Sequence, residues 1–222
     1  MIDIADLLES SLPGNYFAPD AYAKGDFESG LIENRQGRRL LALPDTLLKG
    51  LYRGLTLEVG SAAAIVLYNC GKKWGKSFFY RFCEELNEYY QKPIAQMSMI
   101  ELVQCLKQCW KAHGWGTIDL NFDDYQQGFL VVEIKQAAFI EMVESPEQPS
   151  CFVEAGLLSA FFSELSETQL HCVQTSCESL GASSNLFILG LAKRLKPVEA
   201  MIEKGQNHQT IMQRLKSDAA RC

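Results

Sequence analysis

The side chains of this 222-residue chain that could support catalysis or bind a metal are three histidines, eight cysteines and two pairs of adjacent carboxylates. Glu84-Glu85 and Asp123-Asp124 are weak candidates for acid–base chemistry, because adjacent residues on an exposed helix or a turn point apart. His113 ends a predicted helix, where a cationic imidazole would interact favourably with the helix dipole. No nucleotide-binding or catalytic signature occurs. We therefore predict no catalytic residues and expect a binding module.

Composition excludes one large class of partners. The formal net charge is -6, the sequence pI is about 5.2, and 47% of the residues are hydrophobic. Nucleic-acid binding needs clustered Lys and Arg to displace counterions from phosphates, and the basic runs at Arg35–Arg39 and Lys193–Lys196 are too short for that. We expect one large hydrophobic core and no nucleic-acid partner.

The N-terminus and the cysteines indicate a cytoplasmic protein, and a peripheral position beside a membrane stays open. The chain opens with acidic residues at Asp3 and Asp6, where a secretory signal carries positive charge, and no stretch approaches the ~20 apolar residues of a membrane span. In a reducing compartment free cysteine behaves as a small buried hydrophobe. We expect most of the cysteines in the core.

Two glycines four residues apart, Gly71 and Gly75, interrupt an apolar helical pattern between Gly60 and Tyr90. Each costs up to about 1 kcal/mol relative to alanine in a helix interior. The pattern therefore predicts that another backbone, or a flat ligand, comes close at these positions. Tight helix packing is the favoured interpretation, with Ala155-Gly156 on a later helix as its counterpart.

The elements around this helix follow from local patterns. Ser98 and Glu101 form a capping box for a helix that should end near Ala112. Alternating apolar residues predict a hairpin at about 118–122 and 130–134, and Ser150 is a plausible N-cap for the following helix. Further elements are expected as a helix at 4–12, a strand at 39–43 with a helix after it, strands at 170–175 and 186–189, and two C-terminal helices. The order predicts an α+β fold with an antiparallel sheet covered by helices on one side.

Aromatic residues recur on the predicted helices and are the candidates for a ligand cavity. Such stripes usually fill a core, but they could also enclose a flat hydrophobic molecule or form a subunit interface. The residues we assign to ligand binding are Trp74, Phe78, Phe82, Trp110, Trp115 and Phe161.

Over about residues 36–192 the chain resembles the 4-vinyl reductase domain family. The segments that carry the resemblance are Tyr68-x-x-Gly71-x-x-x-Gly75, the hairpin, the run from Cys151 through Ala155-Gly156-Leu157-Leu158, and Cys177-x-x-x-Gly181 with Phe187. That family shares its fold with the small subunits of the TRAPP tethering complex and resembles heme-based nitric-oxide sensors. The resemblance divides the chain into an arm at 1–35, a ligand-binding domain at 36–192 and a helical extension at 193–222.

The resemblance also implies a metal site that has lost half its ligands. Where the family has Cys, Glu, Cys and Cys, this chain has Cys151, Gln174, Cys177 and Asn185. Zinc prefers four donors among thiolate, imidazole and carboxylate, and amides do not compete. We therefore expect no metal at this degenerate site, and zinc in particular is not expected.

Three functions remain open at this stage. The preferred one is non-catalytic binding of a hydrophobic small molecule such as a tetrapyrrole or bilin, with a role in photosystem assembly or pigment metabolism that the family resemblance implies. No cofactor other than such a tetrapyrrole is expected, and the partners would be a second copy of the chain and a photosynthetic membrane complex. The second is a scaffold that acts through a helical dimer surface without ligand. The third is an enzyme of pigment metabolism.

Overall fold

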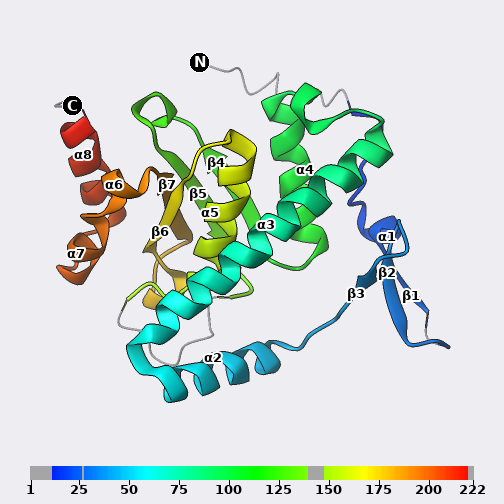
Figure 1. Ribbon diagram of the computed structural model, residues 1–222, viewed down its shortest axis with the longest axis horizontal. Coiled ribbons are helices and arrows are strands. Elements are labelled where there is room, and N and C mark those ends of the chain that lie inside the picture. Colours follow the sequence, from blue (N-terminus) through cyan, green and yellow to red (C-terminus); the bar gives the residue numbers. More distant parts are fainter. Residues whose placement is uncertain (1–11, 27, 140–147, 220–222) are drawn as a thin grey trace. The chain divides into compact units, whose positions relative to one another are not determined.

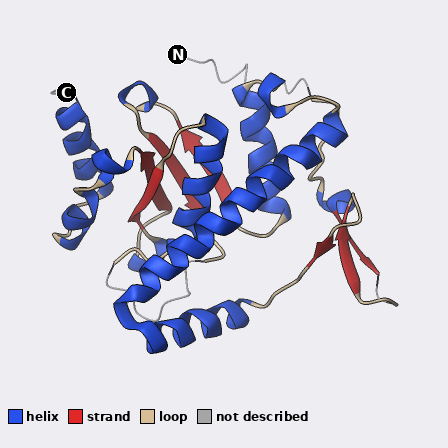
Figure 2. Cartoon of the chain, viewed as in Figure 1, coloured by secondary structure: helices blue, strands red, loops and turns tan. Residues whose placement is uncertain are grey.

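The computed structural model describes residues 12–26, 28–139 and 148–219, and the chain forms two compact units. The first, called the arm unit below, combines Met1–Pro44 with Tyr80–Trp115. The second, called the sheet unit, combines Asp45–Phe79 with Gly116–Cys222. Figure 1 traces the elements along the sequence, and Figure 2 shows that the strands gather in two separate sheets.

The sheet unit is built on four antiparallel strands in the order β4-β5-β7-β6. They are β4 (Thr117–Asn121), β5 (Leu130–Lys135), β6 (His171–Ser176) and β7 (Asn185–Gly190). The predicted hairpin is confirmed, since Ile118 lies opposite Ile134. It turns through η3 (Tyr125–Gln127) and through Gly128, which has a φ of 79° that favours glycine.

Helices cover both faces of this sheet. Ile188 of β7 and Val131 of β5 belong to an apolar cluster with α6 (Ala192–Leu195), α7 (Val198–Glu203) and α8 (His208–Ala219). Successive strand residues point to opposite faces. Phe187, fully buried, must therefore point to the other face, which α5 (Phe152–Ser166) covers (Figure 1). The α+β class and the antiparallel sheet are as predicted. The expectation of helices on one side alone is wrong, because the C-terminal helices carry their own apolar face.

The glycines of α3 (Ala63–Tyr90) lie directly against the backbone of α5. A Cβ added at Gly71 would lie 2.1 Å from the carbonyl oxygen of Val153, and one at Gly75 would lie 2.5 Å from that of Leu157. The contact is reciprocal, since a Cβ at Gly156 would lie 2.1 Å from the carbonyl oxygen of Tyr68. Real Cβ atoms do not approach so closely, so the two helices can pack this way only at glycines. The predicted close approach is confirmed, and the neighbour is a backbone.

Two predicted helix starts have different outcomes. The capping box of α4 (Met99–Ala112) is confirmed, because the Ser98 side chain accepts from the amide of Glu101 and the Glu101 carboxylate accepts from the amide of Ser98. The N-cap of α5 is Cys151, whose side chain makes no capping hydrogen bond. The prediction of Ser150 as the N-cap is therefore wrong by one residue. The predicted helix at 4–12 falls almost entirely outside the described residues.

The arm unit contains a small sheet that the sequence patterns do not predict. The unit consists of α1 (Pro19–Tyr22), β1 (Ala23–Asp26), β2 (Leu31–Asn34), β3 (Arg39–Leu40), η2 (Ile94–Gln96) and α4, with the C-terminal part of α3. The patterns favour a loop up to Gly30 and a strand over the whole of 39–43, and both expectations are wrong. Short polar strands such as Ala23–Asp26 lack the alternation that reveals a strand.

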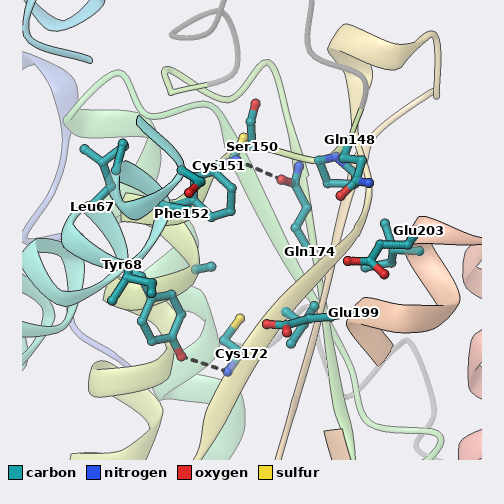
Figure 3. Close-up of a pocket in the computed structure, with 18 of the residues that line it drawn as sticks. Leu67, Tyr68, Gln148, Ser150, Cys151, Phe152, Cys172, Gln174, Glu199 and Glu203 are labelled. Atoms are coloured by element: carbon teal, nitrogen blue, oxygen red, sulfur yellow. Dashed lines mark hydrogen bonds between the residues drawn. The ribbon is translucent and has the colours of Figure 1, made fainter. Parts of the chain in front are cut away.

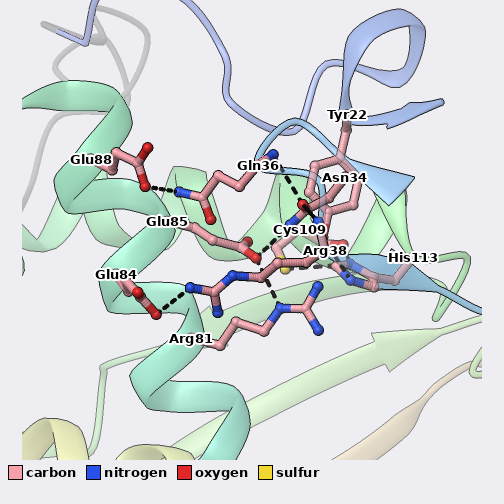
Figure 4. A network of polar contacts seen from close by, with 10 residues as sticks. All are labelled: Tyr22, Asn34, Gln36, Arg38, Arg81, Glu84, Glu85, Glu88, Cys109 and His113. Atoms are coloured by element: carbon pink, nitrogen blue, oxygen red, sulfur yellow. Dashed lines mark hydrogen bonds and ion pairs between the residues drawn. The ribbon is translucent and has the colours of Figure 1, made fainter. Parts of the chain in front are cut away.

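A buried polar network organises the arm unit (Figure 4). The Glu85 carboxylate is 2% exposed and accepts from Asn34 Nδ2 at 2.7 Å and from Arg81 Nε at 2.9 Å. Burial raises the pKa of Glu85 despite these partners. Because a buried charge is tolerated only when it is paired and hydrogen-bonded, these contacts link β2 to α3.

The remaining elements are α2 (Asp45–Val59), η1 (Gly60–Ala62) and η4 (Glu178–Leu180), all in the sheet unit. Within the described part of the chain, no helix is long and apolar enough to cross a membrane.

Substituting Gly156 with alanine should lower the free energy of unfolding by about 3 kcal/mol, as over-packing does in other cores. The added Cβ would lie against the Tyr68 carbonyl, so α3 and α5 must separate. Urea unfolding followed by circular dichroism measures the effect. The matched control is Gly50→Ala in α2, where nothing lies within 4 Å of the added Cβ. It should stabilise by up to about 1 kcal/mol, and equal effects of the two substitutions would contradict the packing argument.

Candidate functional site

A cleft of about 980 Å³ lies along the edge strand β6 in the sheet unit. Its walls come from the end of α2, η1, the start of α3, residues 148–155, β6 and α7. Figure 3 shows the side chains from these elements around the space. β6 is the last strand of its sheet, so no further strand occupies this side. We call this space the β6 cleft.

A tyrosine–histidine pair marks the polar part of the β6 cleft. The Tyr68 hydroxyl lies 2.7 Å from His171 Nδ1, and the amide of Cys172 donates to the same hydroxyl at 3.2 Å. Because the Tyr68 oxygen accepts from that amide, its own proton is available for Nδ1, which must then be the unprotonated nitrogen. Burial raises the pKa of Tyr68 to about 12 and lowers the pKa of His171. Both side chains are neutral at pH 7.

The four positions of the degenerate metal site are joined by hydrogen bonds. The amide of Cys151 donates to Gln174 Oε1 at 2.9 Å, and Gln174 Nε2 donates to Asn185 Oδ1 at 3.2 Å. Asn185 Nδ2 donates in turn to Glu178 Oε2 at 2.7 Å and to the Ile134 carbonyl at 3.1 Å. The two amides that stand in place of the family's ligands therefore satisfy one another and the surrounding backbone.

The two thiols of this cluster complete it. A hydrogen bond between the Cys151 and Cys177 side chains lowers the pKa of Cys177 and raises that of Cys151. Cys177 Sγ also lies 2.9 Å from Ser179 Oγ. Both thiols are 1% exposed.

These residues do not fit zinc. Gln174 and Asn185 use their oxygen atoms to accept N–H groups, so two thiols are the only soft donors left among the four positions. Within the described residues, no three His, Cys, Asp or Glu side chains are placed to hold a metal ion. The arrangement acts as a polar clasp between the ends of β5, β6, β7 and α5.

The six aromatic residues assigned from the sequence fall into two groups. In the sheet unit, Phe78 lies 6.5 Å from Trp74 and 5.6 Å from Phe161 between ring centroids. In the arm unit, Phe82 stacks on Phe17 at 5.9 Å, and Trp110 lies 5.3 Å from Trp115.

None of the six lines the β6 cleft. Their contact with a ligand stays a prediction. Tyr68, His171 and Glu199, which do line the cleft, are not among the residues that the sequence assigns to ligand binding. Tyr68 is the one with a usable signal, because it stands in the glycine motif of α3.

The other candidate residues serve structure. His113 Nδ1 lies 2.8 Å from the Cys109 carbonyl and Nε2 lies 3.0 Å from the Tyr22 hydroxyl (Figure 4). Burial lowers the pKa of His113, so the expectation of a cationic imidazole is wrong, and it caps α4 as a neutral donor. The adjacent carboxylates diverge as predicted: Asp124 pairs with Lys216 at 2.9 Å.

Residues 130–191 match the family model of the 4-vinyl reductase domain. The chain contains a 4-vinyl reductase domain. The matched segment of this domain runs from β5 through α5 and β6 to β7, so it includes the β6 side of the cleft and all four positions of the polar clasp. The family resemblance seen in the sequence is therefore confirmed. No curated protein matches the chain.

Several solved structures are similar to this chain. The phenol-responsive sensory domain of the transcription activator PoxR, solved with phenol, has a TM-score of 0.61 at 12% identity and covers 83% of this chain and 92% of that one. Subunit 3 of the trafficking protein particle complex from Naegleria fowleri, covalently bound to palmitic acid, has a TM-score of 0.50 at 16% identity, with 66% and 94% covered. A vinyl-4-reductase family protein from Methanocaldococcus jannaschii has a TM-score of 0.46 at 16% identity, with 68% and 82% covered. At these identities the first two comparisons show the shared fold.

The neutral His171 should make stability fall in acid. Because burial lowers its pKa in the folded state, the unfolded chain takes up a proton first. The contribution is fully present above the unfolded pKa of about 6.5. It is lost as the pH falls below that value towards the folded pKa. Free energies of unfolding from urea titrations between pH 7.5 and 5.0 should decline less steeply in His171→Asn, whose amide oxygen can still accept from Tyr68. The same slope in both proteins would contradict this assignment.

Proposed function

We propose that this chain binds a hydrophobic small molecule in the β6 cleft without transforming it. The observation that carries the proposal is the shape and lining of the cleft itself. Its volume of about 980 Å³ lies at the upper end of the range for small-molecule sites. Ala63, Leu67 and Ala155 supply buried apolar surface, and a few polar groups, Tyr68 and His171 among them, can set orientation.

The comparisons support this proposal through the fold. A 4-vinyl reductase domain and the likeness to a phenol-responsive sensory domain agree with a small-molecule-binding role. The related trafficking subunit was solved with palmitic acid, and the sensory domain with phenol. Each of those ligands is a hydrophobic molecule with one polar end, which is also the composition of the β6 cleft.

The finer proposal is that the ligand is a tetrapyrrole or bilin and that the protein serves photosystem assembly or pigment metabolism. In this proposal the domain at 36–192 holds the pigment, with the arm at 1–35 and the extension at 193–222 as additions. The protein would work in the cytoplasm, beside a photosynthetic membrane complex. This part rests on the family resemblance described above.

Binding without catalysis is favoured over an enzyme by the chemistry of the cleft. Its two cysteines, Cys151 and Cys172, have pKa values raised well above the usual range, by a hydrogen bond to Cys177 and by burial respectively. Such thiols are protonated and poorly nucleophilic at pH 7. Tyr68 and His171 satisfy each other, so neither is placed as a poised acid or base.

The β6 cleft should bind 2-naphthol, a neutral aromatic probe, saturably in isothermal titration calorimetry. Ala64→Trp should weaken this binding at least about tenfold, which corresponds to 1.4 kcal/mol, because Ala64 is a half-buried lining residue and the indole would fill the space. Ala62→Trp, at an exposed position outside the lining, is the matched control. Biliverdin, titrated in parallel, tests the finer proposal. If Trp74→Ala removed binding and Ala64→Trp did not, the aromatic set would be the site and the cleft would not.

A second candidate function, a scaffold that works as a dimer, is favoured by the outer face of α2. Leu47, Leu51 and Leu57 are 46%, 61% and 77% exposed. At 100° per residue they share a side of the helix with Gly50 and Gly54, opposite the buried Tyr52. Nothing lies within 4 Å of a Cβ added at either glycine. The glycines repeat the spacing by which α3 meets α5.

A second copy of the chain fits this face of α2 because its centre carries no charge. Asp45 and Lys49, towards the other side, already pair within the helix at 3.0 Å. Two such faces therefore meet without placing like charges together, and their glycines permit close approach.

If this face pairs two chains, light scattering coupled to gel filtration should give a dimer mass for the natural sequence and a monomer mass for Leu51→Glu. Burying a charge without a partner opposes association. Leu180→Glu, which places the same change at a 43% exposed leucine of η4, is the matched control and should stay dimeric. A monomer mass for the natural sequence at tens of micromolar would contradict the scaffold candidate.

A further inference from the structure

The charge around the β6 cleft has one sign. Glu199 and Glu203 lie on successive turns of α7, and Figure 3 shows both side chains turned towards the cleft. Among the lining residues that the structure describes there is no Lys or Arg. The one histidine there, His171, is neutral because burial lowers its pKa. The polar wall of the cleft therefore carries negative charge that no cation of the lining balances.

The opposite wall offers apolar surface. Leu67 of α3 and Ala155 of α5 are buried, and Phe152 adds an aromatic ring at the start of α5. At the floor, the Cys172 side chain is 2% exposed, and the structure records no hydrogen bond for its sulfur within the described residues. A buried group of this kind, lining a cavity, is a second feature that a bound molecule would contact.

We propose that the β6 cleft selects a hydrophobic amine, with its apolar body against α3 and α5 and its ammonium group facing Glu199 and Glu203. This inference rests on the proposed function and adds the charge of the ligand to it. Two carboxylates four residues apart on a helix repel each other, and a cation between them relieves that repulsion. A ligand carboxylate in the same place would add to it.

The proposal also bears on pigments. A tetrapyrrole with free propionate groups would have to direct those carboxylates away from α7 and out of the cleft. An esterified or amine-bearing analogue would meet no such restriction. The cleft therefore discriminates by the head group of the ligand more than by the size of its ring system.

The test uses three probes with one apolar body: 1-naphthylmethylamine, 1-naphthalenemethanol and 1-naphthoic acid, titrated into the full chain by calorimetry at pH 7.5. In 20 mM NaCl the amine should bind about tenfold more tightly than the acid, with the alcohol between them. The preference should shrink in 0.5 M NaCl, because Glu199 and Glu203 are exposed and salt screens exposed charges.

Two variants separate the head group from the cleft. In E199Q/E203Q the affinities for amine and acid should come within about twofold, which is near zero free-energy difference, while the alcohol binds as before. Glu167→Gln, at the C-terminal cap of α5 and outside the lining, is the matched control and should keep the preference. Equal binding of all three probes to the natural chain would overturn this inference and leave the proposed function standing. Binding of none of them would overturn both.

Discussion

The contact between the backbones of α3 and α5 is the constraint on which the rest of the sheet unit depends. It exists because Gly71, Gly75 and Gly156 carry no Cβ, and each would otherwise drive an atom into the partner helix. Close packing recovers dispersion energy that offsets the cost of placing glycine inside helices. Since α5 also covers the sheet, this one contact fixes the start of α3 relative to β6.

The polar pair of the cleft follows from that contact. The carbonyl of Tyr68 lies against Gly156, so the backbone of Tyr68 is held where α3 touches α5. Its hydroxyl then reaches the edge strand and meets His171 and the amide of Cys172. The hydrogen bonds that set orientation in the β6 cleft are thus placed by helix packing. A change at Gly156 would disturb the cleft even though Gly156 does not line it.

How far the sequence predicts this structure depends on how local each feature is. The capping box at Ser98 and the hairpin that pairs Ile118 with Ile134 depend on neighbouring residues, and both predictions are confirmed. The close approach at the glycines is predictable because its cost has to be offset somewhere. The cleft is not, because Tyr68, His171 and Glu199 come from three elements that only the tertiary fold brings together. Aromatic periodicity points elsewhere, since bulky rings at helical spacing fill a core as readily as they line a cavity.

The polar clasp shows how a metal-type arrangement can be kept without a metal. Gln174 and Asn185 cannot compete as zinc ligands, yet they stay in position because each amide offers both a donor and an acceptor. Asn185 alone joins Gln174, Glu178 and the Ile134 carbonyl. The clasp therefore ties β5 to the turn after β6 and to the start of α5, which also forms one end of the cleft. A neutral clasp adds no positive charge beside the cleft, so the carboxylates of α7 keep their influence on which ligand can enter.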